Sequence, residues 1–284
     1  MADQIRITEY TDPGCPWAWN AEPIRARLDF LYGDCLEWRV KMVGLSDEPR
    51  TGDDYDAQAV SERLRSMSRK HPMPIDTRPR AYGAATLPAC RLVVGAKLHR
   101  PDQVRRVLRQ LRVRNFSGEQ LDAPETLEAV ATDAGISVTE AQSWQQDPQV
   151  EEALRADMAA ARQPAPAARA LDHKLGNWSG GRRYTCPSYE VAREDGACIA
   201  IPGFQPLAAY EIVLANMAPG MERREAPSSA SEVLEWSAIP MATAEVAAVM
   251  DTDFTSAREQ LARVAQLEPV GADGFWRVRV AASG

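Results

Sequence analysis

Cysteine and histidine are scarce in this chain, which has five cysteines and three histidines among its 284 residues. An odd number of cysteines without regular spacing does not form a framework of structural disulfides. Sparse disulfides are typical of a reducing compartment, so we expect a cytoplasmic protein. The histidines show no spacing typical of metal ligands, and we expect no metal site.

Long hydrophobic runs and an excess of positive charge are also absent. No stretch approaches the roughly 20 apolar residues of a membrane span, so we expect no membrane partner. An alternating apolar segment begins at residue 5, which leaves no room for a signal peptide. The net charge of −7 argues against a nucleic-acid partner. The abundance of alanine, arginine and proline suggests a bacterial source.

A cysteine lies where the first predicted strand leads into the first predicted helix. Residues 5–11 alternate as a strand, Pro13-Gly14 predicts a turn, and Pro16 suits the first position of a helix. Cys15 therefore lies at a helix N-terminus, where unpaired N–H groups and the helix dipole favour a thiolate. We expect a nucleophilic thiol with a lowered pKa, the alternative being a buried structural cysteine.

Two segments resemble the DsbA-like branch of the thioredoxin superfamily. Residues 12–17, D-P-G-C-P-W, are similar to the D-P-x-C-P-W-C motif of the FrnE-like group, with Ala18 in place of the second cysteine. Residues 184–191, Y-T-C-P-S-Y-E-V, resemble the loop whose cis-proline faces the active cysteine. The resemblance implies that Pro187 is cis and that Cys186 faces Cys15. Residues 203–217 resemble the closing strand, turn and last helix of that fold.

The resemblance covers about residues 3–222 and implies an α/β thioredoxin-like fold with a large helical insertion. We assign residues 1–56 and 173–224 to the thioredoxin-like domain and 57–172 to the insertion. A Pro- and Ser-containing linker leads to a small winged-helix-like module at 231–284. This module has four basic and eight acidic residues, which favours packing or protein contact over DNA binding. We expect it to be dispensable for the core.

Hydrophobic periodicity predicts the individual elements. Strands are expected at 5–11, 36–43, 188–192 and 198–201, with a terminal β-wing at 270–280. Helices are expected at 16–32, 57–70, 86–98, 101–114, 124–134, 139–145, 148–162, 206–217, 231–237, 243–250 (with Thr243 as N-cap) and 254–267.

The missing second cysteine leaves three routes for the chemistry of Cys15. A low-molecular-weight thiol such as glutathione or mycothiol could resolve a Cys15 adduct. A bound thiol could instead be activated for transfer or isomerisation, as in kappa-class glutathione transferases and hydroxychromene-carboxylate isomerases, which resemble this fold. In the third route Cys186 resolves a disulfide with Cys15 or shares a metal with it. The alternative to this third route is that Cys186 is a small residue whose backbone, and not its thiol, pairs with the substrate.

The leading interpretation is a monothiol thiol-disulfide oxidoreductase that acts through Cys15 within the motif Pro16, Trp17 and Ala18. Its partner would be a small-molecule thiol or a protein thiol, with no tightly bound cofactor. The alternative is a non-catalytic adaptor that has lost dithiol chemistry. Weaker candidates for substrate binding are Asp12, Arg182 and Arg183. Asp12 is equally explained as a turn residue, and Arg182 and Arg183 are equally explained as a solvated basic pair. The sequence leaves the oligomeric state open.

Overall fold

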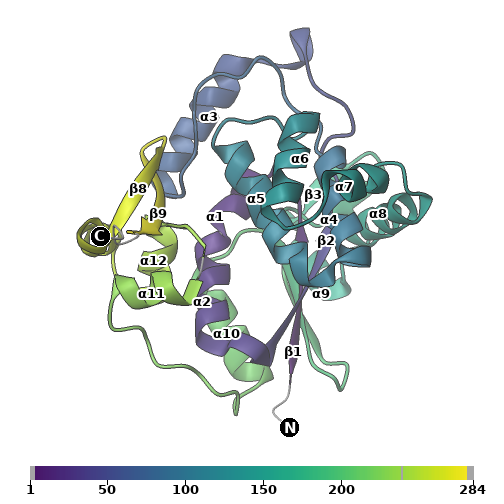
Figure 1. Ribbon diagram of the computed structural model, residues 1–284. Coiled ribbons are helices and arrows are strands. Elements are labelled where there is room, and N and C mark those ends of the chain that lie inside the picture. Colours follow the sequence, from purple (N-terminus) through teal and green to yellow (C-terminus); the bar gives the residue numbers. More distant parts are fainter. Residues whose placement is uncertain (1–3, 238, 280–284) are drawn as a thin grey trace.

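The computed structural model describes residues 4–237 and 239–279, and a four-stranded sheet lies at its centre (Figure 1). The strands run in the order β2-β1-β5-β6. Their bounds are β1 Ile5–Thr11, β2 Leu36–Met42, β5 Ser188–Ala192 and β6 Cys198–Ile201. Strand β2 pairs parallel to β1, whereas β5 pairs antiparallel to β1 and β6. All four strands were predicted, because each alternates or carries an apolar run bounded by turn residues.

The segment expected as one helix at 16–32 forms two helices, α1 Pro16–Asn20 and α2 Glu22–Tyr32. Pro23 has no N–H to continue the hydrogen-bond ladder, so the chain breaks at Ala21 and starts again. Helix α2 ends at Gly33, whose φ of 46° suits glycine. Helix α10, Leu207–Met217, packs with α2 on one face of the sheet. These breaks place a short separate helix directly after Cys15.

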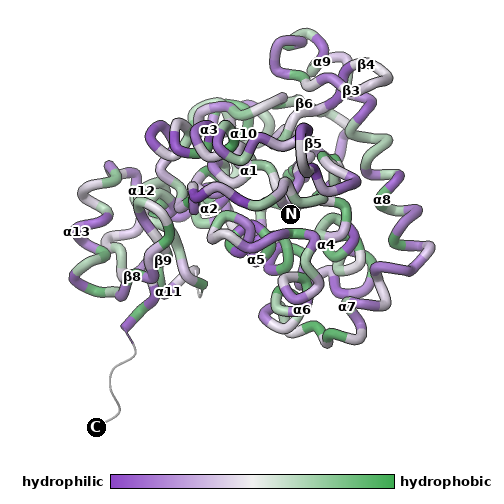
Figure 2. Tube along the Cα trace, turned by 90° about the horizontal axis from the view of Figure 1, so that it is seen from above, coloured by the Kyte–Doolittle hydropathy of each residue, from purple (hydrophilic) through white to green (hydrophobic). Residues whose placement is uncertain are grey.

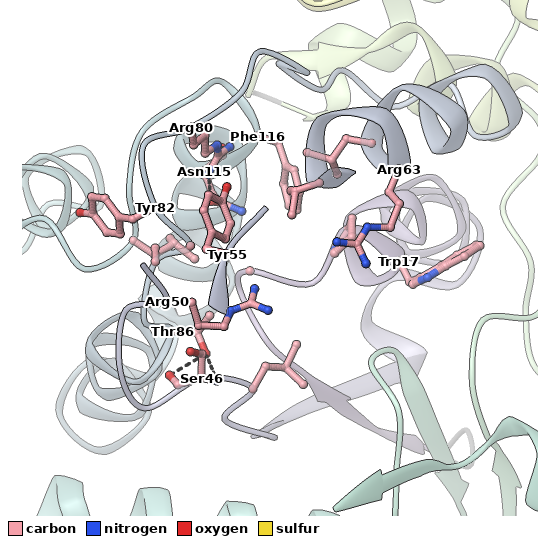
Figure 3. A pocket seen from close by; sticks show the side chains of 18 of the residues that line it. Trp17, Ser46, Arg50, Tyr55, Arg63, Arg80, Tyr82, Thr86, Asn115 and Phe116 are labelled. Atoms are coloured by element: carbon pink, nitrogen blue, oxygen red, sulfur yellow. Dashed lines mark hydrogen bonds between the residues drawn. The ribbon is translucent and has the colours of Figure 1, made fainter. Parts of the chain in front are cut away.

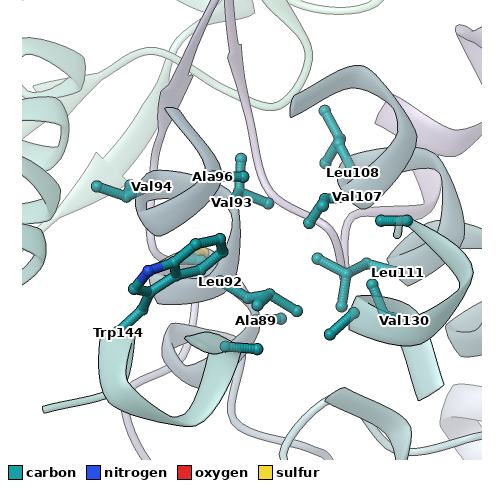
Figure 4. Packing of buried hydrophobic residues seen from close by; sticks show 14 of the residues in the cluster. Ala89, Leu92, Val93, Val94, Ala96, Val107, Leu108, Leu111, Val130 and Trp144 are labelled. Atoms are coloured by element: carbon teal, nitrogen blue, oxygen red, sulfur yellow. The ribbon is translucent and has the colours of Figure 1, made fainter. Parts of the chain in front are cut away.

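The predicted helical insertion covers the other face of the sheet. Its helices are α3 Ala57–Lys70, α4 Leu87–His99, α5 Val104–Phe116, α6 Pro124–Asp133, α7 Val138–Trp144, α8 Pro148–Ala161 and α9 Pro166–Arg169. Leu92, Leu108 and Leu111 form much of a buried cluster that joins α4 and α5 (Figure 4). Met42 at the end of β2 belongs to the same cluster, so the insertion shares its core with the sheet.

Helix α4 passes close to Trp144 because Gly95 has no side chain. A Cβ at residue 95 would lie 2.5 Å from Cε3 of Trp144. We expect Gly95→Ala to lower the free energy of unfolding by about 1–3 kcal/mol, the usual cost of overpacking a core. Denaturant titration would measure the loss, with Gly220→Ala as the control because nothing lies within 4 Å of its added Cβ. Equal stability of the two variants would contradict the prediction.

Two elements between the insertion and β5 were not predicted. They are the strands β3 Gly176–Trp178 and β4 Gly181–Arg183, which pair with each other as a separate two-stranded sheet. Each has only three residues, which is too short for a periodic pattern to stand out.

The C-terminal residues form three helices and a small sheet, while their description as a winged-helix-like module stays a prediction. Its elements are α11 Ala230–Ser237, β7 Met241–Ala242, α12 Thr243–Met250, α13 Phe254–Val264, β8 Ala265–Val270 and β9 Asp273–Val278. The strands run in the order β7-β9-β8. Two details were wrong. Helix α13 ends at Val264, because the following residues pair with β9, and Thr243 is the first helical residue rather than the N-cap.

The packing of this module argues against the expectation that it is dispensable for the core. Phe30 and Leu31 of α2 lie in one buried cluster with Val246, Leu261 and Trp276 of the module. In Figure 2 the module lies beside the main body, with α12 next to α2. Removing it would therefore expose apolar side chains of the helix that follows the Cys15 motif.

The module is not expected to bind duplex DNA. Arg258 pairs with Asp273, and Arg277 pairs with Glu268, so these two cations are partly neutralised. Binding to DNA needs cations that are free to replace counterions on phosphates. Fluorescence anisotropy with a labelled duplex should show no salt-dependent binding at micromolar protein, and such binding would contradict the prediction.

Candidate active site

Cys15 is the residue that immediately precedes α1. Its N–H donates to the Asp12 carbonyl oxygen at 3.1 Å, and its own carbonyl accepts the N–H of Trp19 at 3.0 Å. Pro16 takes the first helical position, as predicted. The thiol therefore faces the free N–H groups of the first helical turn. The backbone N–H groups of Ala18 and Trp17 both lower the pKa of Cys15.

The structure brings Cys15 and Cys186 together across 171 residues of sequence. The Cys15 thiol donates to the Cys186 carbonyl oxygen at 3.2 Å. The Cys186–Pro187 peptide bond is cis. Both cysteines are free thiols and nearly buried, with 6% and 7% of their surfaces exposed. Ala18 lies in the same buried cluster as the two cysteines.

The two thiols have opposite electrostatic environments. A hydrogen bond from the Cys186 thiol is the largest influence on Cys15, and it lowers the pKa of Cys15 despite burial. Burial is the largest influence on Cys186 and raises its pKa well above the ordinary value, with further increases from Cys15. Cys15 is therefore the thiol that ionises first, and Cys186 remains a protonated donor beside it.

Trp17 stands at the edge of the site, with 42% of its surface exposed. Its ring lies 5.2 Å from that of His71 at the end of α3 and 5.5 Å from that of Phe204, measured between centroids. His71 and Phe204 also contact each other at 5.1 Å. The sequence identified Trp17 but not its two neighbours. Segments 54 and 187 residues away in sequence supply them, and no local pattern links the three.

A family model described as the DSBA-like thioredoxin domain matches residues 6–165. The chain belongs to the DSBA-like thioredoxin domain family. The match covers more than half of the chain and includes the Cys15 motif. It bears out the resemblance to DsbA-like proteins, while membership of the FrnE-like group stays a prediction.

Solved structures of DsbA-like proteins share this fold. A candidate protein disulfide isomerase from Nitrosomonas europaea has a TM-score of 0.57 and 19% identity, covering 75% of this chain and 97% of its own. The cytosolic disulfide reductase DsbM from Pseudomonas aeruginosa has a TM-score of 0.52 and 19% identity, covering 74% and 99%. About a quarter of this DSBA-like chain therefore has no counterpart in either structure.

A relative from Halalkalibacterium halodurans matches nearly the whole chain. It is the ClpXP adapter protein SpxH, which is 26% identical over 289 residues. The alignment covers 96% of this chain and 88% of SpxH. Unlike the solved structures, SpxH thus extends the similarity beyond the thioredoxin-like part of this DSBA-like protein.

Asp12 is not placed to bind a substrate, which corrects one of the weaker predictions. Its side chain has no exposed surface and accepts hydrogen bonds from the Gly14 and Leu45 N–H groups and the Thr86 hydroxyl, each at 2.8 Å. Burial raises the pKa of Asp12, and this effect outweighs the three hydrogen bonds, which lower the pKa. Asp12 therefore positions the loop that carries Cys15.

The two predicted arginines differ in their surroundings. Arg182 donates to the Asp172 carboxylate at 2.8 Å and to the Asn177 side chain, so its guanidinium is already occupied by neighbouring residues. These contacts give Arg182 local partners, and its role in substrate binding stays a prediction. Arg183 donates to the Tyr184 carbonyl oxygen at 2.8 Å, and its charge lowers the pKa of Cys186. Arg183 therefore acts electrostatically on the Cys186 side of the site.

Among residues 4–237 and 239–279, no helix is long and apolar enough to cross a membrane. The same part of the chain holds no group of three or more His, Cys, Asp or Glu side chains that could bind a metal ion.

Cys15 is expected to alkylate fastest of the five cysteines and at lower pH than an ordinary thiol of pKa about 8.5. A lowered pKa means that the thiolate fraction, and hence the rate, reaches half its maximum at lower pH. Rates of iodoacetamide modification against pH, with peptide mapping, would measure this. Cys186→Ala should move the profile to higher pH, whereas Cys186→Ser, which retains a donor, should move it less.

The Cys15 assignment has its own control in this experiment. Cys15→Ser should remove the fast phase completely. A fast-reacting thiol that persists in Cys15→Ser would contradict the assignment of the nucleophile.

Proposed function

We propose that this protein is a cytoplasmic thiol-disulfide oxidoreductase that acts through Cys15 as a monothiol. The Cys15 thiolate attacks one sulfur of a substrate disulfide, which forms a mixed disulfide and releases the other sulfur as a thiolate. A low-molecular-weight thiol, such as glutathione or mycothiol, then attacks the substrate sulfur of the mixed disulfide in its thiolate form. The products are a disulfide of the small thiol with the substrate and the regenerated Cys15 thiolate.

One observation carries this proposal: the Cys15 thiol lies at the N-terminus of α1, within hydrogen-bond distance of the Cys186 residue. The Cys186 thiol and the helix N–H groups lower the pKa of Cys15, which increases the thiolate available at neutral pH. Family membership supports disulfide chemistry in general.

Two further observations support a small thiol as the second substrate. Ala18 offers no resolving sulfur within the motif. One structural neighbour is DsbM from Pseudomonas aeruginosa with GSH, at a TM-score of 0.51 and 18% identity. Arg183, whose charge acts at the Cys186 side of the site, is the residue we propose to receive a carboxylate of that thiol.

A second candidate is a non-catalytic adaptor. The similarity to the ClpXP adapter protein SpxH spans 96% of this chain, whereas the two solved neighbours cover 75% and 74% of it. An adaptor needs the fold and its surfaces but not a resolving cysteine, so Ala18 is compatible with it as well.

Intact-mass measurement after incubation with glutathione disulfide separates these functions. One glutathione adduct, mapped to Cys15 and reversed by glutathione, is the result expected for monothiol exchange. Loss of two hydrogens without an adduct would mean that Cys186 resolves Cys15, and would overturn the monothiol step. An unchanged mass would overturn catalysis and favour the adaptor. Cys198→Ser serves as the control, because Cys198 is the exposed cysteine outside the site.

A further inference from the structure

A cavity of about 540 Å³ lies directly beside the Cys15 motif. Gly14, Pro16 and Trp17 form one wall, and α3 contributes much of the other (Figure 3). The residues that follow β2, Leu45 and Ser46, also line it. Cys186 precedes β5, and β1 separates β2 from β5 in the sheet. The cavity is therefore on the opposite side of the motif from the Cys186–Pro187 loop.

Among the described residues, three arginines and no acidic residue line this cavity. They are Arg50, Arg63 and Arg80, which come from a loop, from α3 and from the loop before α4. Arg63 donates to the Ala59 carbonyl within its own helix. Asp76, a nearby acid whose charge acts on Arg80, is paired with Arg78 at 2.6 Å. The cavity thus concentrates positive charge in a protein whose net charge is −7.

Within the described part of the chain, all hydrogen-bond acceptors of the Arg80 guanidinium are neutral groups. It donates to the Asn115 side-chain oxygen at 2.8 Å, to the Asn115 carbonyl and to the Glu119 carbonyl at 3.4 Å. Burial lowers the pKa of Arg80, because its charge has lost water without gaining a bound carboxylate. A buried cation is costly unless an anion compensates it.

The floor between the arginines is apolar. It consists of aliphatic and aromatic side chains, namely Val60, Leu64, Met67, Phe116 and Leu121. Tyr55 and Tyr82 add rings with polar ends. Apolar walls with a few convergent polar groups, in a volume of a few hundred Å³, are typical of small-molecule sites.

Backbone hydrogen bonds hold the cavity walls in place. Arg50 and Gly83 exchange two of them, at 2.8 and 2.9 Å, and the Thr86 N–H donates to the Ser46 carbonyl at 2.8 Å. The Ser61 hydroxyl donates to the Thr77 carbonyl at 2.5 Å, which fixes α3 against the opposite loop. The site is therefore preformed, and a ligand would not have to order it.

We infer that this cavity binds an organic anion that has an apolar body, such as a medium-chain carboxylate. The anionic group meets Arg50, Arg63 and Arg80, and the hydrocarbon covers Leu64, Phe116 and the neighbouring apolar side chains. This site is separate from the thiol chemistry of Cys15 and needs no redox step.

The test is isothermal titration of the full-length protein with decanoate. Arg50→Gln/Arg63→Gln removes two exposed cations of the cavity and leaves Cys15 and the half-buried Arg80 unchanged. Arg65→Gln/Arg69→Gln is the matched control, because it makes the same charge change at exposed positions that do not line the cavity. We expect at least a tenfold loss of decanoate affinity in the first variant and less than a twofold change in the control. Decanol should bind the wild-type protein at least tenfold more weakly than decanoate.

Several outcomes would overturn the inference. Equal affinity of both double variants would place the decanoate elsewhere, and equal affinity for decanol would remove the role of the arginines. Failure of decanoate to bind the wild-type protein would exclude this ligand class. Stronger competition by an acidic aromatic peptide would assign the cavity to a protein segment instead. None of these results depends on whether Cys15 forms a glutathione adduct, so the inference and the proposed function fail independently.

Discussion

Replacing Glu22 by alanine is expected to remove a large fraction of the stability of this protein. The Glu22 side chain is completely buried and pairs with three arginines of α5. Arg105 lies 2.6 Å from its carboxylate, Arg109 lies 3.3 Å from it, and Arg112 also binds it directly. The substitution leaves Arg109 and Arg112, each 3% exposed at the side chain, with one partner fewer.

This carboxylate connects all three parts of the molecule. Arg112 also binds Glu9 of β1 at 2.8 Å, and Arg109 binds Glu245 of the C-terminal module at 2.7 Å. Breaking a buried ion pair by removing one partner costs about 3–5 kcal/mol, because the remaining charge stays buried. Domains are typically stable by only about 5–15 kcal/mol, so the loss is a large fraction of the total.

Urea denaturation followed by circular dichroism would measure the effect. Glu259→Ala, which removes an exposed carboxylate from α13, is the control and should change the free energy of unfolding by less than about 0.5 kcal/mol. If Glu22→Ala is so unstable that it cannot be purified, Glu22→Gln provides a measurable intermediate, since it retains hydrogen bonds but not the charge. A loss below about 1 kcal/mol in Glu22→Ala would contradict the prediction.

The same network predicts the effect of acid. Burial alone would raise the pKa of Glu22, but Arg105, Arg112 and Arg109 together hold it far below the ordinary value. A carboxyl whose pKa is lower in the folded state binds its proton more readily when unfolded. Its contribution to stability is therefore complete above the unfolded pKa of about 4.3 and is lost as the pH falls further.

The sequence predicted the sheet and the motif well because their signals are local. Strand β1, the turn at Gly14 and the helix start at Pro16 follow one another within a dozen residues. Each element depends mainly on alternation or on the geometry of proline and glycine. Pairing Cys15 with Cys186 needed the resemblance to a known loop, because no local rule links residues so far apart.

The ion network and the cavity were missed for the opposite reason. Arg105, Arg109 and Arg112 are spaced by four and three residues on one face of α5, which could have indicated a charged stripe inside the core. Nothing local identified Glu22 as their partner, 83 to 90 residues away. The role of the C-terminal module was predicted from its charge, whereas its apolar residues determine how it packs against α2.

Replacing Ala18 by cysteine is expected to change the chemistry of the site more than any other single substitution that retains Cys15. Ala18 is 1% exposed and shares a buried cluster with Cys15, and its N–H is directed at the Cys15 sulfur. Residues three apart at a helix start are neighbours, so a thiol at 18 lies within reach of the Cys15 sulfur. The variant would then contain the dithiol motif that the wild-type chain lacks.

The rate at which glutathione is released from a mixed disulfide with Cys15 should differ between the wild-type protein and Ala18→Cys. In the wild-type protein an external thiol must collide with a nearly buried sulfur, whereas in Ala18→Cys the attacking thiol is already held beside it. Intramolecular attack of this kind should accelerate release on the order of 100-fold or more. After oxidation with glutathione disulfide, Ala18→Cys should therefore lose two hydrogens and retain no adduct.

Ala26→Cys is the matched control, since Ala26 is also a buried alanine but lies in the cluster of α2 with the C-terminal module. It should keep the wild-type adduct and the wild-type release rate, because its sulfur belongs to a different cluster from Cys15. If the thiols at residues 15 and 18 both stay free in oxidised Ala18→Cys, the loop fixed by Asp12 holds the Cys15 sulfur away from residue 18. The site would then be built to keep Cys15 against Cys186, with no place for a second cysteine in the motif.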